Sequence, residues 1–250
     1  MSFPQTYIIY LKSNNMKKGL ILSVVILAMV VNTAFSRSQS GDKETRNVSG
    51  FSKVSFGVSG DLYINIGPDF KVVLEGDKDV LRDILTEVKN GKLVIRKDNW
   101  RFNLNEKVTV YVTMPELKGL GVSGSGKAEI KDAVKTSDMN LSVSGSGKLY
   151  TTDLVLSNLD CNISGSGDII IGGNGNTTRA DISISGSGNY SGEQLKIGSA
   201  DISISGSGNC TCNVTESLKA SISGSGNVNY FGNSAKIDTR VSGSGHVRSR

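Results

Sequence analysis

The sequence predicts an all-β fold in which the chain winds as a parallel β-helix, a solenoid with about 20 residues per coil. Two observations predict it: a repeated tetrapeptide, Ser-Gly-Ser-Gly, and a regular alternation of apolar and polar residues around each copy. The copies begin at Ser123, Ser144, Ser164, Ser185, Ser205, Ser223 and Ser242. Their spacing of 18 to 21 residues suits one coil of a solenoid.

When the copies are aligned, the apolar residues fall at odd distances from the first serine and polar residues at most even distances. The position directly before the motif holds Val122, Val143, Ile163, Ile184, Ile204, Ile222 and Val241. A period of two is typical of strands with one buried face, whereas a helix would need apolar residues three and four apart. The same parity predicts that both glycines of each motif face inward and both serines outward. Asn189, Asn209 and Asn227 recur at one position and are expected to form a ladder.

The composition excludes several classes of function. With 3 Cys and 1 His among 250 residues, the chain has little material for zinc sites, Cys/His nucleophiles or a disulfide framework. The 30 glycines form neither a phosphate-binding loop nor a nucleophile elbow. We therefore predict no catalytic residues, no metal site and no cofactor.

The amino terminus predicts export. Lys17 and Lys18 precede an apolar run over 19–31, and Ala34 and Ser36 provide small residues for cleavage. We expect an upstream extension over 1–15, a signal peptide over 16–36 and a linker over 37–47. The exported protein would have no integral membrane span and would lie in the periplasm, on the outer surface or outside the cell. Without the leader, 25 basic residues face 23 acidic ones, so no nucleic-acid partner is predicted.

The region 48–120 is less regular and is expected to form the head, or capping part, of a solenoid whose repeat coils span 121–250. Short strands are predicted over Phe51–Phe56, Asp61–Ile66, Lys71–Leu74, Lys92–Arg96 and Lys107–Met114. The segment Val58–Asp61 resembles a degenerate copy of the motif. Apolar residues at helical spacing predict a helix over Asp77–Val88, with Asp77 as its cap and Asn90-Gly91 after its end. This helix would cover one end of the solenoid.

These segments resemble a known family. The matching residues are Phe51–Ser55, Gly60–Ile66, Val72–Asp77, Gly91–Ile95 and the Ser-Gly-Ser-Gly series. The sequence is similar to the auto-transporter adhesin family with a head GIN domain, found in exported proteins of Bacteroidetes-type bacteria. The resemblance implies a right-handed parallel β-helix and an envelope or surface location, and it assigns a role to no particular residue.

Two groups of side chains invite a chemical interpretation. Cys161, Cys210 and Cys212 occupy inward positions and are expected to be buried small hydrophobic residues, since neighbours on one strand face are poorly placed for a disulfide. Asp160, Asp181 and Asp201 recur four residues before the motif in three successive coils. Stacked carboxylates about 4.8 Å apart could hold a Ca²⁺ ion, or they could form a corner that faces water.

Two surfaces are candidates for binding a glycan or a surface protein. One is the row of outward serines: Ser125, Ser146, Ser166, Ser187, Ser207, Ser225 and Ser244. The other is the loop that carries Trp100 and Phe102, whose rings could contact sugars or cover the core. We predict a non-enzymatic, adhesin-like or structural binding protein. The alternatives are a carbohydrate-active β-helix enzyme and a scaffold that associates end to end through the strand edges of its last coil.

Overall fold

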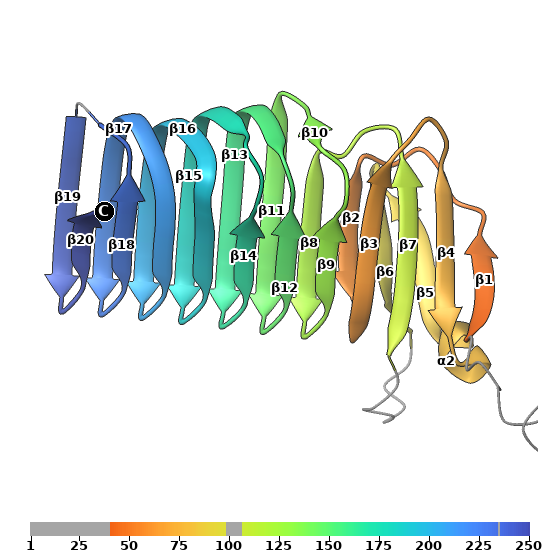
Figure 1. Ribbon diagram of the computed structural model, residues 1–250. Helices are drawn as coiled ribbons and strands as arrows, with labels where there is room; N and C mark the ends of the chain where they lie inside the picture. Colours follow the sequence, from red (N-terminus) through yellow and green to blue (C-terminus); the bar gives the residue numbers. More distant parts are fainter. Residues whose placement is uncertain (1–40, 99–106, 235) are drawn as a thin grey trace, which may run out of the picture. The chain divides into compact units, whose positions relative to one another are not determined.

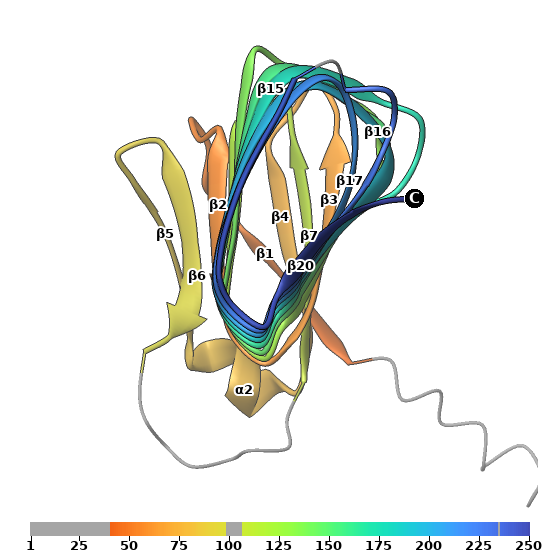
Figure 2. The ribbon, with the colours of Figure 1, turned by 90° about the vertical axis from the view of Figure 1, so that its left-hand side faces the viewer.

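The computed structural model describes residues 41–98, 107–234 and 236–250. In this part of the chain the strands wind as a right-handed solenoid, and most coils contribute one strand to each of two facing sheets (Figures 1 and 2). The predicted all-β solenoid is confirmed. The predicted extension over 1–15, the signal peptide over 16–36, and Trp100 and Phe102 lie outside the described residues.

We call the two sheets by their place relative to the motif. The post-motif face contains β3 (Gly60–Ile66), β9 (Lys127–Ile130), β12 (Lys148–Thr151), β14 (Asp168–Ile171), the first parts of β16 (Asn189–Gly206) and β17 (Asn209–Gly224), β18 (Asn227–Phe231) and β20 (His246–Ser249). The pre-motif face contains β2 (Lys53–Gly57), β8 (Gly119–Gly124), β11 (Asp138–Gly145), β13 (Leu154–Gly165), β15 (Asn176–Gly186), the last parts of β16 and β17, and β19 (Lys236–Gly243). The two-residue strand β10 (Val134–Lys135) pairs with β13.

The register follows the repeat. Adjacent coils pair in parallel, so that Ser144 lies beside Ser123 on one side and Ser164 on the other. Identical positions of successive coils therefore stack along the solenoid, as the aligned sequence predicts. The pairing carries inward residues onto inward residues and builds continuous apolar columns through the core.

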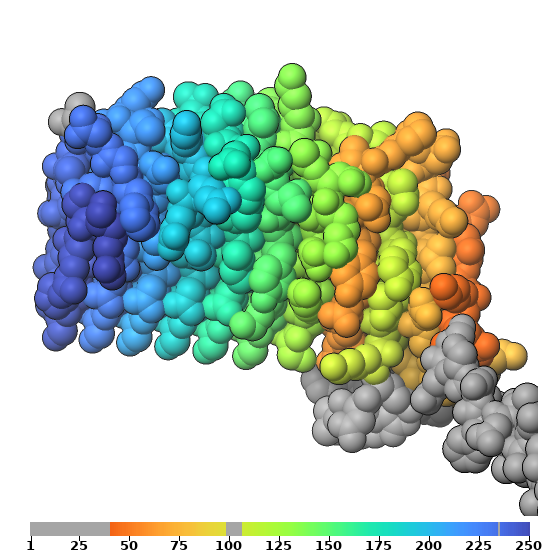
Figure 3. All heavy atoms as spheres, in the orientation of Figure 1, coloured from red at the N-terminus to blue at the C-terminus, as the bar shows by residue number. Residues whose placement is uncertain are grey.

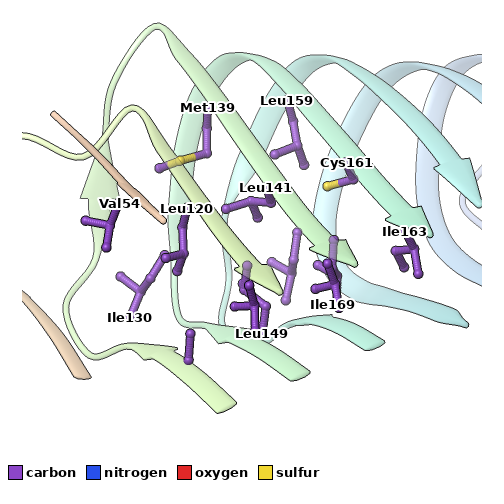
Figure 4. Packing of buried hydrophobic residues seen from close by; sticks show 14 of the residues in the cluster. Val54, Leu120, Ile130, Met139, Leu141, Leu149, Leu159, Cys161, Ile163 and Ile169 are labelled. Carbon is purple, nitrogen blue, oxygen red and sulfur yellow. The ribbon is translucent and has the colours of Figure 1, made fainter. Parts of the chain in front are cut away.

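The core fills the space between the two faces. Leu120, Leu141, Cys161 and their neighbours point inward from successive coils (Figure 4). Alternating burial over most of β13 and β15 confirms the predicted period of two. The last coil is different, because Ile237 is 47% exposed and Val241 44% exposed at positions that earlier coils bury.

The prediction that both motif glycines face inward is wrong for the first of them. The first glycine is exposed or half-buried in every copy, with φ from 84° at Gly124 to 127° at Gly243, whereas the second is buried in every copy but the last, where Gly245 is half-buried. The chain turns from one face to the other within the motif, and this turn interrupts the alternation. A Cβ on Gly165 would lie 2.6 Å from the carbonyl oxygen of Gly145 in the coil before it. Glycine is therefore required here by backbone conformation and by the neighbouring coil.

The region before the repeats begins with a coil that lacks the motif. β2 and β3 pair in parallel with β8 and β9, and Ser59 Oγ lies 3.5 Å from Ser125 Oγ. The interpretation of 58–61 as a degenerate motif is thus confirmed. Beyond this coil, β6 (Lys92–Lys97) and β7 (Val108–Met114) extend the two faces, each in parallel with its neighbour.

Antiparallel strands end the solenoid on this side. β4 (Lys71–Gly76) pairs antiparallel with β7, β1 (Asp42–Arg46) pairs antiparallel with β4, and β5 (Ile84–Lys89) pairs antiparallel with β6. The segment expected as a linker, 37–47, therefore includes the edge strand β1. Further coils of the solenoid would have to add in parallel, and these antiparallel strands occupy the positions where they would pair.

The helix predicted over 77–88 is much shorter than expected. It is α2 (Lys78–Arg82), and Asp77 caps it as predicted, since Asp77 Oδ1 accepts a hydrogen bond of 2.9 Å from the Asp79 backbone N–H. Residues 84–89 form β5 instead, because Asn90 (φ 51°) and Gly91 (φ 69°) make a tight turn that returns the chain along β6. The helix joins β4 to β5 and buries Val80 and Leu81 in the core.

Candidate functional site

The outward serines form one continuous row. All seven second serines of the motif are exposed at the corner where each coil turns, and the backbone holds them there. The Ser166 N–H, for example, donates a hydrogen bond of 2.8 Å to the Gly145 carbonyl of the preceding coil. The row presents hydroxyl groups at the strand spacing of about 4.8 Å. It is a regular polar edge of exposed hydroxyl groups.

A second outward row, on the post-motif face, was missed at the sequence level. Tyr111, Tyr63, Glu129 and Tyr150 occupy adjacent positions on β7, β3, β9 and β12, in that order. Tyr111 is 40% exposed, and its ring stacks on Tyr63 with centroids 5.6 Å apart and an interplanar angle of 25°. We call these three tyrosines and the glutamate the tyrosine row. Figure 3 views the protein from this side, where the bands of successive coils lie next to one another.

Two lysines flank the tyrosine row. Lys131 Nζ lies 4.9 Å from the ring centroid of Tyr63, and Lys127 Nζ lies 4.8 Å from that of Tyr150. Both also pair with Glu129, at 2.6 Å from Lys131 and 3.4 Å from Lys127. The hydrogen bond from Lys131 lowers the pKa of Glu129, so its carboxylate stays ionised and can accept hydrogen bonds. Cation–π contacts and ion pairs therefore hold the row in a defined arrangement.

Tyr111 adds a hydrogen-bond donor to the row. Desolvation, followed by the nearby Glu75 carboxylate, raises the pKa of Tyr111, so its hydroxyl remains protonated at neutral pH. A signal for this surface is present in the sequence, because Tyr150 stands six residues after Ser144, at an even and therefore outward position. Tyr63 occupies the matching place in the coil that lacks the motif, where no aligned copy marks it.

The three aspartates considered as a cation site do stack on one another. However, basic side chains of the same chain form ion pairs with two of them. Asp160, Asp181 and Asp201 are adjacent across β13, β15 and β16. Arg179 pairs with Asp181 at 3.2 Å, and Lys219 pairs with Asp201 at 2.8 Å. Among the described residues no group of three or more acidic, His or Cys side chains could hold a metal ion. The aspartates lie within strands of the pre-motif face and not at the expected corner, and their protein partners favour a water-facing charged surface over a calcium site.

A shallow depression of about 140 Å³ lies beside these aspartates. It is lined by Arg179, Ser199, Ala200, Asp201, Ser217 and Lys219. Its polar groups satisfy one another, because Ser217 Oγ donates to Ser199 Oγ at 2.9 Å and the ionic groups pair as described above. The depression offers no unpartnered group directed at a ligand.

The cysteines are buried in the core, as predicted, and none forms a disulfide. Burial raises the pKa values of the Cys161 and Cys210 thiols, which therefore remain protonated and unreactive at neutral pH. Tyr190 lies fully buried close to them, and its hydroxyl has no hydrogen-bond partner in the structure. Cys161, Cys210 and Cys212 act as small apolar residues of the core.

Several solved structures share this fold. A putative adhesin from Bacteroides fragilis is 24% identical, with a TM-score of 0.80 over 85% of this chain and 98% of that one. A putative adhesin from Parabacteroides distasonis is 22% identical, with a TM-score of 0.70 over 84% and 96%. A putative lipid binding protein from the same species is 24% identical, with a TM-score of 0.66 over 85% and 98%. At these identities the likeness shows the fold alone.

No curated protein matches the chain. In the described part of the chain no helix is long and apolar enough to cross a membrane. A family model, described as "Putative auto-transporter adhesin, head GIN domain", matches residues 50–234. Because this match covers well over half of the sequence, the chain belongs to that family.

Proposed function

We propose that the protein is an exported, non-enzymatic surface protein that binds a glycan through the tyrosine row. Membership of an adhesin family, together with neighbours named as adhesins, supports a surface adhesin-like role. The observation that carries the proposal is the alignment of Tyr111, Tyr63 and Tyr150 on one outward face, flanked by Lys127 and Lys131.

The chemistry of the row suits a sugar chain. One face of a pyranose ring exposes C–H groups, which pack on an aromatic ring, while its hydroxyl groups need donors and acceptors at the rim. Tyrosine provides an apolar ring with a polar tip, and the adjacent lysines and Glu129 provide donors and an ionised acceptor. Tyr111 and Tyr150 are separated by three strand spacings, or about 14 Å. This span favours an oligosaccharide over a single sugar.

The sheet also favours a ligand that lies along a surface. Each tyrosine is fixed on a strand that pairs on both sides, so little side-chain and backbone freedom is lost when a ligand binds. The depression described above lies on the other face of the solenoid, away from the row. We infer a binding platform rather than an enclosed pocket.

The two surfaces predicted from the sequence, the serine row and the loop with Trp100 and Phe102, are also proposed as binding surfaces, after the tyrosine row. The serine row is the rival site for a glycan, and the loop with Trp100 and Phe102 could add aromatic contacts. A leader cleaved after residue 36 would deliver the protein to the envelope or beyond. Association of copies through the last coil is a second candidate function, favoured by the exposure of Ile237 and Val241.

A glycan array tests the proposal directly. We expect the wild-type protein to bind a subset of glycans. A variant with Tyr63→Ser, Tyr111→Ser and Tyr150→Ser should lose at least about tenfold in affinity, which corresponds to the loss of one or two aromatic contacts. A matched variant with Ser146→Ala, Ser166→Ala and Ser187→Ala changes three residues of the serine row and should bind as the wild type does. Thermal unfolding of both variants shows that they remain folded.

Other outcomes contradict particular parts of the proposal. Equal binding by the tyrosine variant, with loss in the serine variant, would move the site to the serine row. An array without any bound glycan would reject a glycan ligand. Release of sugars from a panel of polysaccharides would reject the non-enzymatic role and favour the carbohydrate-active enzyme.

A further inference from the structure

The coil that contains β19 and β20 is the last one among the described residues. β19 pairs with β17 on one side and β20 pairs with β18 on one side, and among the described residues neither has a strand on its other side. Ile237 and Val241 point inward on β19 but are 47% and 44% exposed, whereas Leu218 and Ile222, their equivalents one coil earlier, are 1% and 2% exposed. Open backbone groups beside exposed apolar side chains form an adhesive surface.

We propose that this surface pairs with the same surface of a second copy. In the proposed dimer β19 lies antiparallel to β19 of the other copy, around a two-fold axis that passes beside Thr239. The inference rests on the self-association proposed above and specifies its geometry. It does not depend on glycan binding.

Compared with the registers centred on neighbouring residues of β19, only this one pairs apolar residues with apolar residues and each charge with its opposite. With Thr239 at the axis, Ile237 lies opposite Val241 on the inward side, and Asp238 lies opposite Arg240 on the outward side. Each apolar residue thus meets an apolar residue, and each charge meets its opposite. Because of the two-fold symmetry, both kinds of pair form twice.

Neighbouring registers are worse for stated reasons. An axis beside Asp238 would place two aspartates opposite each other, and an axis beside Arg240 would place two arginines opposite each other. An axis between two residues would bring inward side chains against outward ones, which exposes the apolar set. The register centred on Thr239 also pairs nearly the whole strand, from Lys236 to Ser242.

The opposite end of the solenoid explains why two copies would form a closed pair. One of its two edge strands, β1, has the sequence Asp-Lys-Glu-Thr-Arg, and four of these five side chains are exposed. The other edge strand, β5, lies on the opposite face and pairs with β6. A charged edge such as that of β1 opposes strand addition. A head-to-tail chain of copies would need this edge, whereas a pair that joins the two last coils does not. The result is an isologous dimer and not a fibre.

β20 lies at the same end of the solenoid, on the other face (Figure 2). A two-fold axis perpendicular to the faces continues each sheet into the same sheet of the partner copy. β20 would therefore meet β20 of the other copy while β19 meets β19. Val247, which packs half-buried against the end of the core, would then be covered together with Ile237 and Val241. The dimer interface would therefore bury the open end of the core in both copies.

Charge reversal tests the pairing. We expect sedimentation velocity over a range of concentrations to show that the wild type is a dimer. Asp238→Arg alone places like charges opposite each other twice and should weaken the dimer at least about tenfold, and Arg240→Asp alone should do the same. Both changes together restore opposite charges in the same register and should return the affinity to within about threefold of the wild type. Asp160→Arg makes the same change of charge in a covered coil and should leave the dimer intact.

The outcomes separate the two levels of the proposal. A wild type that stays monomeric at all concentrations would reject self-association and, with it, the geometry. A stable dimer that neither single variant weakens, or that the double variant fails to restore, would reject the pairing around Thr239 while self-association stands. Assemblies that grow with concentration would reject the closed pair. Glycan binding, measured separately on the same variants, should be unchanged in each case.

Discussion

The repeat coils and the region before them use glycine for different reasons. In the coils from β11 onward, each first motif glycine lies against the backbone of the preceding coil, so its lack of a side chain is a condition for stacking. In the region before the repeats, Gly91 also has a positive φ, of 69°, but a Cβ there would meet no atom within 4 Å. Glycine in the coils serves the contact between coils, and Gly91 serves a turn.

One substitution made at both places should produce the largest difference. Gly165→Ala combines an unfavourable backbone angle, φ 112°, with a Cβ 2.6 Å from the Gly145 carbonyl oxygen, and we expect a loss of about 3–5 kcal/mol in the free energy of unfolding. Gly91→Ala has only the unfavourable angle and should lose about 1 kcal/mol. Urea unfolding of the two variants measures the difference. Equal losses would mean that the coils can move apart to admit a methyl group.

This contrast also explains how far sequence analysis reaches. The coils were predictable because each repeats the same two-residue alternation, and one alignment assigned Leu141, Cys161 and Ile182 to the same buried column. The turn at the first glycine was not, because positive φ breaks the parity on which that alignment depends. The apolar residues over 84–89 are spaced as in a helix. The tight turn at Asn90-Gly91 instead makes this segment pair with β6 as a hairpin.

The candidate site was harder to predict than the fold. The serine row followed from the motif, but nothing in a single coil marks three tyrosines as neighbours. Tyr63 and Tyr111 are 48 residues apart in the sequence and become adjacent only because β7 pairs with β3 after an intervening excursion through β4, α2, β5 and β6. The order of the strands in this region is a property of the tertiary structure, which a repeat period cannot supply.

Side-chain hydrogen bonds extend the comparison between the two regions. In the coils, Asn227 donates to Asn209 at 3.0 Å, Asn209 donates to Asn189 at 2.9 Å, and Asn189 donates to Asp168 at 2.9 Å, which confirms the predicted asparagine ladder. Within this ladder Asn209 both donates and accepts, whereas Asn227 only donates. Removing an inner member should therefore cost more than removing the outer one.

We expect Asn209→Ala to lower the free energy of unfolding by about 2 kcal/mol and Asn227→Ala by about 1 kcal/mol, since each half-buried hydrogen bond contributes about 1 kcal/mol. Chemical denaturation of both variants provides the measurement. The double variant should lose less than the sum of the two single losses, because both changes remove the same bond between Asn209 and Asn227. Strictly additive losses would show that the ladder is a set of independent surface contacts.

In the region before the repeats, a hydrogen bond within one short segment, the Asp77 cap of α2, contributes to stability. In the coils, the corresponding hydrogen bonds join one coil to the next. Asp77→Ala removes the acceptor for the Asp79 backbone N–H and should lower the free energy of unfolding by about 1 kcal/mol. Asp79→Ala breaks only an exposed ion pair with Arg82, and its effect should stay below about 0.5 kcal/mol. Thermal and chemical unfolding of this pair of variants compares a cap with a surface charge on the same short helix. If Asp77→Ala proved as mild as its control, burial of Val80 and Leu81 alone would hold the helix at the end of the solenoid.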